Sequence, residues 1–345
     1  MALKMKLKQI LARMGTRGLV SVGATVIVLL VFGLMPYYVD VDKSYVGYYI
    51  FITCVYLTVA QGWNLVAGYT GQISLGQNAF FGLGSYTMAM LWLHNVTKTY
   101  YFFDPVLMIC AGIAPTIIAF LIGMPLLSRL HGDYFSFGTL GMGMIINVLF
   151  VKGGSLTGGA NGIYLDASKF STMRVYWWVA ILVAFLATLV VYLITRSRIG
   201  LALRAIREDE ISAASHGISV LKYKVLAFMV GAFMAGVAGS IYGYYLFHLE
   251  PASVFNMNWL FYPILMVVLG GTGTIIGPVI GAMIVSAIFA YGDIYFGGYH
   301  PIVSGLLIIL VMKFMPGGIM SVVTKVPGLF QRGGGAIPDG AVASK

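Results

Sequence analysis

Long runs of apolar residues without charged side chains recur along the whole chain, and they constrain its fold more than any other feature. Most are long enough to cross the hydrocarbon layer of a membrane as a helix, which takes about 20 residues. The shorter runs at 258–269 and 301–312 fall below this length. The sequence therefore predicts an all-α protein, a polytopic transmembrane helical bundle of about 8–10 spans. The expected runs are 18–35, 45–66, 73–93, 106–128, 134–151, 176–194, 225–247, 258–269, 275–292 and 301–312.

The composition agrees with a membrane bundle. Hydrophobic residues make up 59% of the chain and charged residues only 9%, whereas soluble domains have about 45–50% and about 25%. A soluble domain cannot hide such an apolar surplus, because its outer surface must carry polar and charged groups. Cys54 and Cys110 both fall inside apolar runs, so we do not expect a disulfide framework.

The basic residues are distributed unequally between the two sides of the expected bundle. If the N-terminus faces the cytoplasm, only five of the 21 basic residues lie outside, namely Lys43, Lys98, Lys152, Lys169 and Arg174. Because cytoplasmic loops are enriched in lysine and arginine, this asymmetry predicts an even number of spans with both termini in the cytoplasm. The net charge of +10 does not indicate nucleic-acid binding, because the basic residues form no continuous patch.

Composition also divides the chain into three parts. Residues 1–17 form a basic cytoplasmic segment, and residues 18–320 form the transmembrane domain, which includes a charged cytoplasmic loop at 196–224. No small-residue cleavage site follows the first apolar run, so we expect that run to be a retained anchor. Residues 321–345 are rich in glycine and proline and have little to bury, which predicts a flexible cytoplasmic tail.

The apolar runs contain no Asp, Glu, Lys, Arg or His. Such residues usually mark a proton relay or an ion site in a membrane, so their absence argues against a proton-coupled carrier and against a membrane enzyme. Sodium coupling through backbone carbonyls at broken helices stays open. The sequence also lacks the G-x-x-x-x-G-K-[ST] loop that cradles nucleotide phosphates. We therefore expect that any ATP-driven transport takes its energy from another subunit.

Two stretches interrupt apolar runs with glycines, hydroxyls and amides. They are GYTGQISLGQNAFFGLGSY at Gly68–Tyr86 and GGTGTIIGP at Gly270–Pro278. Interrupted spans in different halves of a transporter indicate a translocation site. The alternative is that their amides simply bond neighbouring helices. The candidates for the solute path are Gln72, Ser74, Gln77, Asn78 and Asn147.

Small residues also recur at intervals of four. Residues four apart share a helix face, and small ones allow two helix backbones to approach closely. This spacing predicts two helix-packing ladders. One consists of Gly231, Ala235, Gly239 and Gly243, and the other of Gly273, Gly277 and Gly281.

The loop at 196–224 gathers much of the charge of the chain. Its segment 201–214 has strong helix formers and no proline or glycine, which predicts one amphipathic helix that stops near Gly217. Such a loop can be a plain solvated helix that sets the membrane orientation. Acidic residues contribute little to orientation, so this does not explain the three adjacent acids Glu208, Asp209 and Glu210, of which we expect Glu210 to be exposed. Docking to a cytoplasmic partner is the other interpretation.

The segment EISAASHG, Glu210–Gly217, resembles the E-A-A-x-x-x-G coupling signature of ABC importer permeases. With Gly217 aligned, Ile211 takes the acidic position and Ser212 the first alanine. Further blocks between residues 71 and 320 are similar, in order, to those of the LivM-type branched-chain amino acid permease family. These blocks are GQISLGQNAFFGLGSYT, LHGDYFSFGTLGMG, LTGGANGIYL, GLALRAIREDE, VLGGTGTIIGPVIGA and KFMPGGIM.

The resemblance implies the ABC importer permease fold and a permease subunit for branched-chain or related amino acids in a bacterial cytoplasmic (inner) membrane. It implies three kinds of partner: a second, LivH-like permease in a heterodimer, two cytoplasmic ATPase subunits, and an extracytoplasmic solute-binding protein. The chain would bind no cofactor itself, because the partner subunits use the ATP. The implied ATPase-coupling residues are Arg204, Arg207, Glu208, Asp209, Glu210, Ala213, Ala214 and Gly217.

Two alternatives stay open at this point. Many relatives of the LivM type carry an acidic and a basic residue after the GDYF block, where this chain has Met144 and Asn147. The cargo of the same kind of importer could therefore be urea or a short amide. The second alternative is a stand-alone secondary carrier or channel, which would move its solute without an ATPase.

Overall fold

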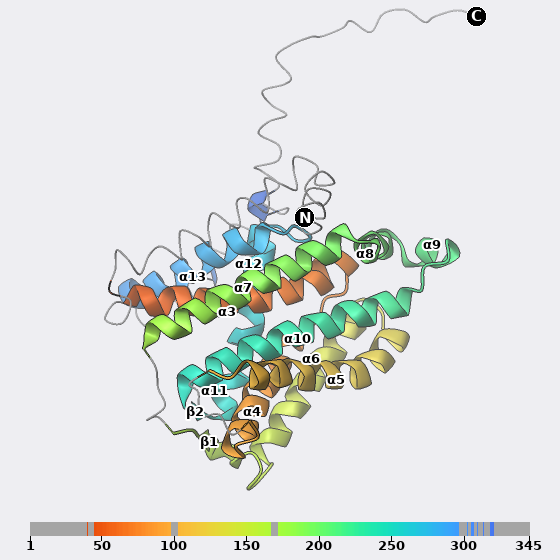
Figure 1. Cartoon of the computed structure of the whole chain (residues 1–345). Coiled ribbons are helices and arrows are strands. Elements are labelled where there is room, and N and C mark those ends of the chain that lie inside the picture. Colours follow the sequence, from red (N-terminus) through yellow and green to blue (C-terminus); the bar gives the residue numbers. More distant parts are fainter. Residues whose placement is uncertain are drawn as a thin grey trace, which may run out of the picture.

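The computed structural model describes residues 40, 45–97, 103–166 and 172–296, together with 302, 305, 306, 309, 313 and 318–320. Helices dominate this part of the chain (Figure 1). The helices are α3 (Tyr45–Trp63), the π-helix η2 (Asn64–Gly68), α4 (Gln77–Leu93), α5 (Pro105–Arg129), α6 (Asp133–Val151), the 3-10 turn η3 (Gly159–Asn161), α7 (Met173–Arg196), α8 (Arg198–Glu208), α9 (Glu210–Ser215), α10 (Val220–Leu246), α11 (Pro251–Val254), α12 (Asn258–Gly270) and α13 (Gly277–Phe296).

Within the described residues, six helices are long and apolar enough to cross a membrane. The apolar part of α13, Gly277–Phe289, is shorter than these six. The expected polytopic helical bundle is confirmed. The expected runs 18–35 and most of 301–312 lie outside the described residues, as do the segments 1–17 and 321–345, so the total number of spans and the side on which the termini lie stay predictions. The six spans are Tyr45–Gly68, Pro105–Arg129, Asp133–Val151, Met173–Arg196, Val220–Leu246 and Pro251–Gly270.

The run expected at 73–93 is not one continuous helix. Residues 71–76 have no regular secondary structure, and α4 begins only at Gln77. The chain turns at Gly71, whose φ of 75° is readily adopted only by glycine. Side chains replace the missing helical hydrogen bonds, since Trp63 Nε1 donates to the Ser74 carbonyl at 2.8 Å and the Leu75 amide donates to Thr139 Oγ1 at 2.9 Å. The prediction of an interruption in this stretch is confirmed.

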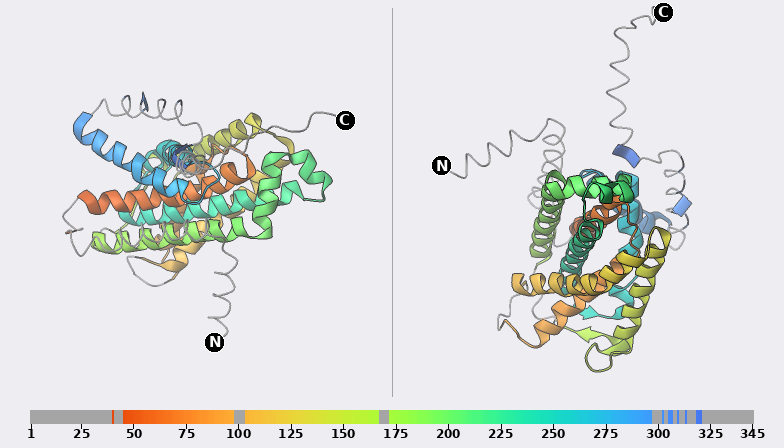
Figure 2. Two further views of the ribbon diagram at one scale, coloured as in Figure 1. Left: turned by 90° about the horizontal axis from the view of Figure 1, so that it is seen from above. Right: turned by 90° about the vertical axis from the view of Figure 1, so that its right-hand side faces the viewer.

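The helix α10 lies in the middle of the bundle and packs against α3, α4, α5 and α7 (Figures 1 and 2). Its glycines allow this. A Cβ atom on Gly231 would lie 2.9 Å from the carbonyl oxygen of Gly62 on α3, and a Cβ atom on Gly62 would lie 2.9 Å from the carbonyl oxygen of Gly231. Gly239 approaches the backbone of α4, where Ser85 Oγ donates to the Gly239 carbonyl at 2.7 Å. Gly243 packs against Met88.

The second expected ladder differs from the structure at one position. Gly273 lies in the loop between α12 and α13 with a φ of 73°, so it does not continue a helical row. Gly277 is the first residue of α13, and Gly281 packs against the backbone of Met266 on α12. Glycine spacing alone could not reveal the turn, because the same residue type serves close helix packing and left-handed loop positions.

The two ends of the bundle carry different structures (Figure 1). At one end, α8 and α9 project beyond the long helices. At the other, β1 (Ile163–Tyr164) and β2 (His248–Leu249) form a short antiparallel ladder, with Ile163 opposite Leu249. The functional residues predicted from the charged loop therefore all lie at the α8 and α9 end.

Candidate functional site

The helices α8 and α9 form a bent projection, residues 198–215, that we call the elbow. In the left view of Figure 2 it extends from the common end of α3, α7 and α10. The helix α8 begins after Ser197, whose Oγ accepts a hydrogen bond from the Ile199 amide at 3.1 Å. Its apolar side, with Leu203 and Ile206 at 0% and 1% exposure, faces the bundle. Arg204, on another face, is exposed.

The single helix expected over 201–214 is wrong, because the chain breaks at Asp209. The backbone there is extended, with φ −159° and ψ 119°. The Asp209 carboxylate accepts a hydrogen bond from the Ser212 amide at 2.6 Å and so caps α9. Aspartate often bonds nearby backbone groups in this way, which disfavours it inside helices and favours it at helix starts. The expected amphipathic helix is therefore two helices joined at an angle.

The end of the elbow agrees with the predicted stop at Gly217. This residue has a φ of 81°, and its amide donates to the carbonyl of Ala214 at 2.9 Å. The next amide, that of Ile218, donates to the carbonyl of Ala213 at 3.1 Å. These two bonds form a Schellman motif, which ends helices at a left-handed glycine.

The two faces of α9 differ in exposure. Ala213 is buried at 4%, whereas Ile211 is 83% exposed. Glu208, Asp209 and Ala214 are exposed as well. The outer face of the elbow thus presents an isolated apolar side chain beside acidic ones.

Three charged side chains of the elbow reach the same short segment, residues 68–72. The Nη1 atom of Arg207 donates to the Gly68 carbonyl at 2.5 Å. The guanidinium of Arg204 lies 5.9 Å from the centre of the Tyr69 ring. Glu210 Oε1 accepts a hydrogen bond from Nε2 of Gln72 at 3.0 Å. Burial raises the pKa of Tyr69 to about 12, and the nearby Arg204 partly offsets this rise.

Glu210 also forms an ion pair that the sequence did not reveal. Its Oε1 lies 2.5 Å from Nζ of Lys224, whose side chain is only 2% exposed, while that of Glu210 is 33% exposed. Lys224 belongs to the first turns of α10, which begins at Val220, five residues earlier than expected. The freely exposed Glu210 expected from the loop is therefore wrong, since its carboxylate neutralises a buried ammonium group.

The two interrupted stretches meet beside the elbow. Asn64, fully buried in the π-helix η2, donates from Nδ2 to the Thr274 carbonyl at 2.8 Å and accepts from the Gly273 amide at 2.9 Å. A Cβ atom on Gly273 would lie 2.5 Å from Nη1 of Arg207 and 2.8 Å from the Gly68 carbonyl oxygen. Residue types alone could not indicate this, although π-turns inside helices often mark functional sites.

The residues predicted for the solute path are dispersed. Gln72 bonds the elbow, and Ser74 is fully buried beside Trp63. Gln77 donates to the Gly231 carbonyl at 3.1 Å, and Asn78 donates to the Phe255 carbonyl at 3.0 Å. The buried Oδ1 atom of Asn147 has no hydrogen-bond partner among the described residues. A solute path through these residues stays a prediction.

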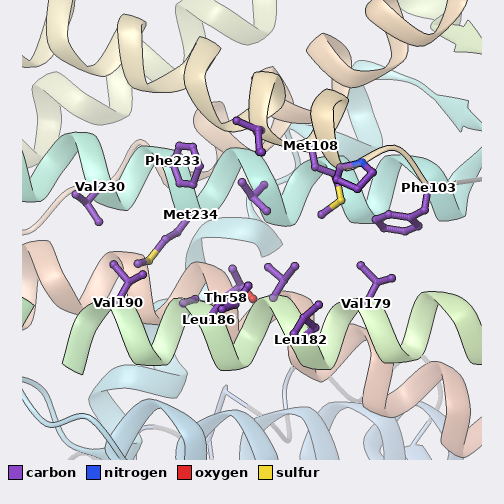
Figure 3. A pocket seen from close by; sticks show the side chains of 15 residues that line it. Thr58, Phe103, Met108, Val179, Leu182, Leu186, Val190, Val230, Phe233 and Met234 are labelled. Carbon is purple, nitrogen blue, oxygen red and sulfur yellow. The ribbon is translucent and has the colours of Figure 1, made fainter. Parts of the chain in front are cut away.

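A groove of about 570 Å³ lies between α7, α10 and the start of α5 (Figure 3). Leu182, Leu186 and Val190 of α7 line one side of it, and Val230 and Met234 of α10 line the other. Thr58 is the polar member of its lining, and the Thr58 hydroxyl donates to the carbonyl of Cys54 at 2.9 Å. Among the described residues, no three His, Cys, Asp or Glu side chains lie together as a metal site would require.

A polytopic helical bundle whose helices are broken by irregular segments is an organisation found among membrane transporters. The family model described as "Branched-chain amino acid transport system / permease component" matches residues 45–312. The chain belongs to this family and is a multi-pass membrane protein.

Curated relatives agree with this assignment. The chain is 31% identical over 299 residues to the high-affinity branched-chain amino acid transport system permease protein LivM of Escherichia coli K12, covering 78% of this chain and 68% of that protein. It is 29% identical over 290 residues to the permease protein LivH of Salmonella typhimurium, covering 77% and 91%. With BraD of Pseudomonas aeruginosa it shares 27% identity over 299 residues, covering 77% and 91%. No solved structure matches the chain.

Proposed function

We propose that this chain is the membrane-spanning permease subunit of an ATP-driven ABC importer for branched-chain amino acids in a bacterial cytoplasmic (inner) membrane. Its termini face the cytoplasm, and it uses ATP only through partner subunits. The family match and the names of the relatives support the class and the cargo. The structural observation that carries the proposal is the elbow, whose inner face is fixed to the bundle while Ile211 on its outer face is 83% exposed.

The elbow has the properties of a docking element for an ATPase subunit. An exposed apolar side chain on a small, capped helix can fill a pocket of a partner, and such anchors contribute most of the binding energy of an interface. Beside it, α9 and the segment after α5 enclose a groove of about 400 Å³ lined by His131, Ile211 and Lys224 among others. The capping at Asp209 and Gly217 holds α9 in one shape, which reduces the entropy lost on binding.

The remaining partners follow from the same assignment. Relatives of both the LivM and the LivH type match this chain, which supports a heterodimer of two related permeases. Two cytoplasmic ATPase subunits would bind at the elbow end, and a solute-binding protein would bind at the opposite end near β1 and β2. The loop at 154–162, in which residues 154–156, 160 and 161 are exposed, and Tyr164, which is 69% exposed, offer a surface there.

Purification of the complete transport system through a tag on this chain tests the proposal. Copurifying proteins are identified, and the complex is reconstituted with its binding protein and assayed for ATPase stimulation by leucine, valine or urea. We expect ATPase subunits to copurify and leucine or valine to stimulate hydrolysis. Stimulation by urea alone would overturn the cargo and keep the importer. Solute movement by the chain without an ATPase would overturn the importer itself.

A further inference from the structure

The elbow is joined to the bundle in two different ways. Through the backbone it continues into α7 at Ser197 and into α10 through residues 216–219. Both joints are short non-helical pieces, and Ser197 has an extended backbone with ψ 176°. Through its side chains, by contrast, the elbow reaches residues 68–72, which lie more than a hundred positions earlier in the sequence.

Those side-chain contacts converge on residues 68–76, which run from the last residue of η2 to the residue before α4 and which we call the connection. Arg207 bonds the carbonyl of Gly68 at one end, and Glu210 bonds the side chain of Gln72 further along. Arg207 and Glu210 lie on either side of the break at Asp209, one on α8 and one on α9. The connection is therefore held at two points, by α8 through Arg207 and by α9 through Glu210.

The connection is also bound to the rest of the bundle by directional bonds. Ser136 Oγ on α6 donates to the Ile73 carbonyl at 2.7 Å, and Thr139 on the same helix accepts from the Leu75 amide at 2.9 Å. Beyond Gly68, Asn64 links η2 to the loop between α12 and α13. A displacement of the connection would thus act on α6, on the start of α4 and on the start of α13.

We propose that the connection 68–76 receives the movement of the elbow, and that Arg207 and Glu210 are the positioning residues that transmit it through Gly68 and Gln72. This inference rests on the proposed coupling of the elbow to an ATPase. The short joint at Ser197 lets the elbow turn relative to α7, and the pair between Glu210 and Lys224 makes the first turns of α10 move with it. The bonds to Gly68 and Gln72 make the connection follow the rotation of the elbow. The connection in turn shifts the first residues of α4 and, through Asn64, those of α13.

A donor series at Gln72 tests this role, because the carboxylate of Glu210 requires a hydrogen-bond donor there. Gln72→Leu and Gln72→Glu remove the donor, whereas Gln72→His retains a neutral ring N–H that can donate to Glu210. In the reconstituted importer, we expect the first two variants to lower solute uptake per ATP hydrolysed by about tenfold, the loss typical of one hydrogen bond to a charged group. Gln72→His should retain wild-type uptake per ATP. A residue with a merely structural role would not follow the presence of a donor.

Arg207→Met provides an independent second variant, and Arg129→Met is its matched control, an exposed arginine at the end of α5 outside the elbow. We expect Arg207→Met to lower uptake per ATP and Arg129→Met to leave it unchanged, with ATPase subunits copurifying in both. If the wild-type chain brings down no ATPase, the proposed function fails. If the ATPase copurifies but Gln72→Leu and Arg207→Met both keep wild-type uptake per ATP, the transmission role alone is overturned.

Discussion

The Nζ atom of Lys224 lies 2.5 Å from Oε1 of Glu210, and this pair joins the first turns of α10 to α9. The ammonium group is almost fully buried, so the carboxylate is its compensating charge. Removing one member of such a pair costs more free energy than the pair contributes, because the other member is left buried and charged.

We therefore expect Glu210→Ala to destabilise the protein by about 3 kcal/mol. Glu210→Lys should do so at least as strongly, since it places a second ammonium group beside Lys224. The double variant Glu210→Gln with Lys224→Met should lose much less, because neither charge remains. Thermal unfolding in detergent measures this, and equal loss in the double and single variants would contradict the charge argument.

The exposed face of the elbow gives a second prediction. Ile211→Asp should leave the thermal stability unchanged, because the side chain is 83% exposed, and it should abolish copurification of the ATPase subunits. Tyr164→Ala at the opposite end of the bundle is the control and should retain them. Retention of the ATPase by Ile211→Asp would show that α9 does not anchor that partner.

Asn64 gives a third prediction, because its side chain bonds η2 to Gly273 and Thr274 in the loop between α12 and α13, a link that we call the clamp. Asn64→Leu leaves the Gly273 amide and the Thr274 carbonyl, both on half-buried residues, without their partner. A fully buried unsatisfied group costs about 1–3 kcal/mol, so we expect a loss near the lower end of that range for each group. Asn64→Asp keeps the acceptor for Gly273 but buries a carboxylate against the Thr274 carbonyl, so it should be destabilised at least as much as Asn64→Leu. Unfolding midpoints of the three proteins give the order, and a fully stable Asn64→Leu would mean that the loop does not depend on the clamp.

Close backbone contact at Gly277 gives a fourth prediction. A Cβ atom there would lie 2.5 Å from the Gly271 carbonyl oxygen, so Gly277→Ala should cost about 1–3 kcal/mol through overpacking. Gly141 on α6 has no atom within 4 Å of such a Cβ, and Gly141→Ala should stabilise by about 0.4–1 kcal/mol. The two variants have the same chemistry, so an equal effect on the unfolding temperature would argue against the contact.

Much of the fold followed from the sequence. The apolar runs at 45–66, 106–128, 134–151 and 176–194 correspond to helices within a few residues, because the need to satisfy backbone polar groups in lipid leaves a long apolar run few choices other than a helix. The interruption near Gly71 and the stop at Gly217 were visible as well, since left-handed backbone conformations favour glycine locally.

The arrangement of the candidate site followed only from the tertiary structure. Nothing near Glu210 in the sequence indicates that Lys224 neutralises it or that Gln72, 138 positions away, donates to it. The break at Asp209 was equally hidden, because aspartate competes for backbone bonds only where the surroundings allow the chain to bend.

The sequence by itself determined the membrane-spanning helices, their interruptions and the charged loop, because hydrophobicity and backbone preference act over a few neighbouring residues. Only the tertiary structure decided that Asn64 bonds Gly273 and that Arg207 reaches Gly68. It also decided that α8 and α9 both hold the connection before α4. These contacts join segments far apart in the chain, and their geometry depends on how the glycine-lined helices pack together.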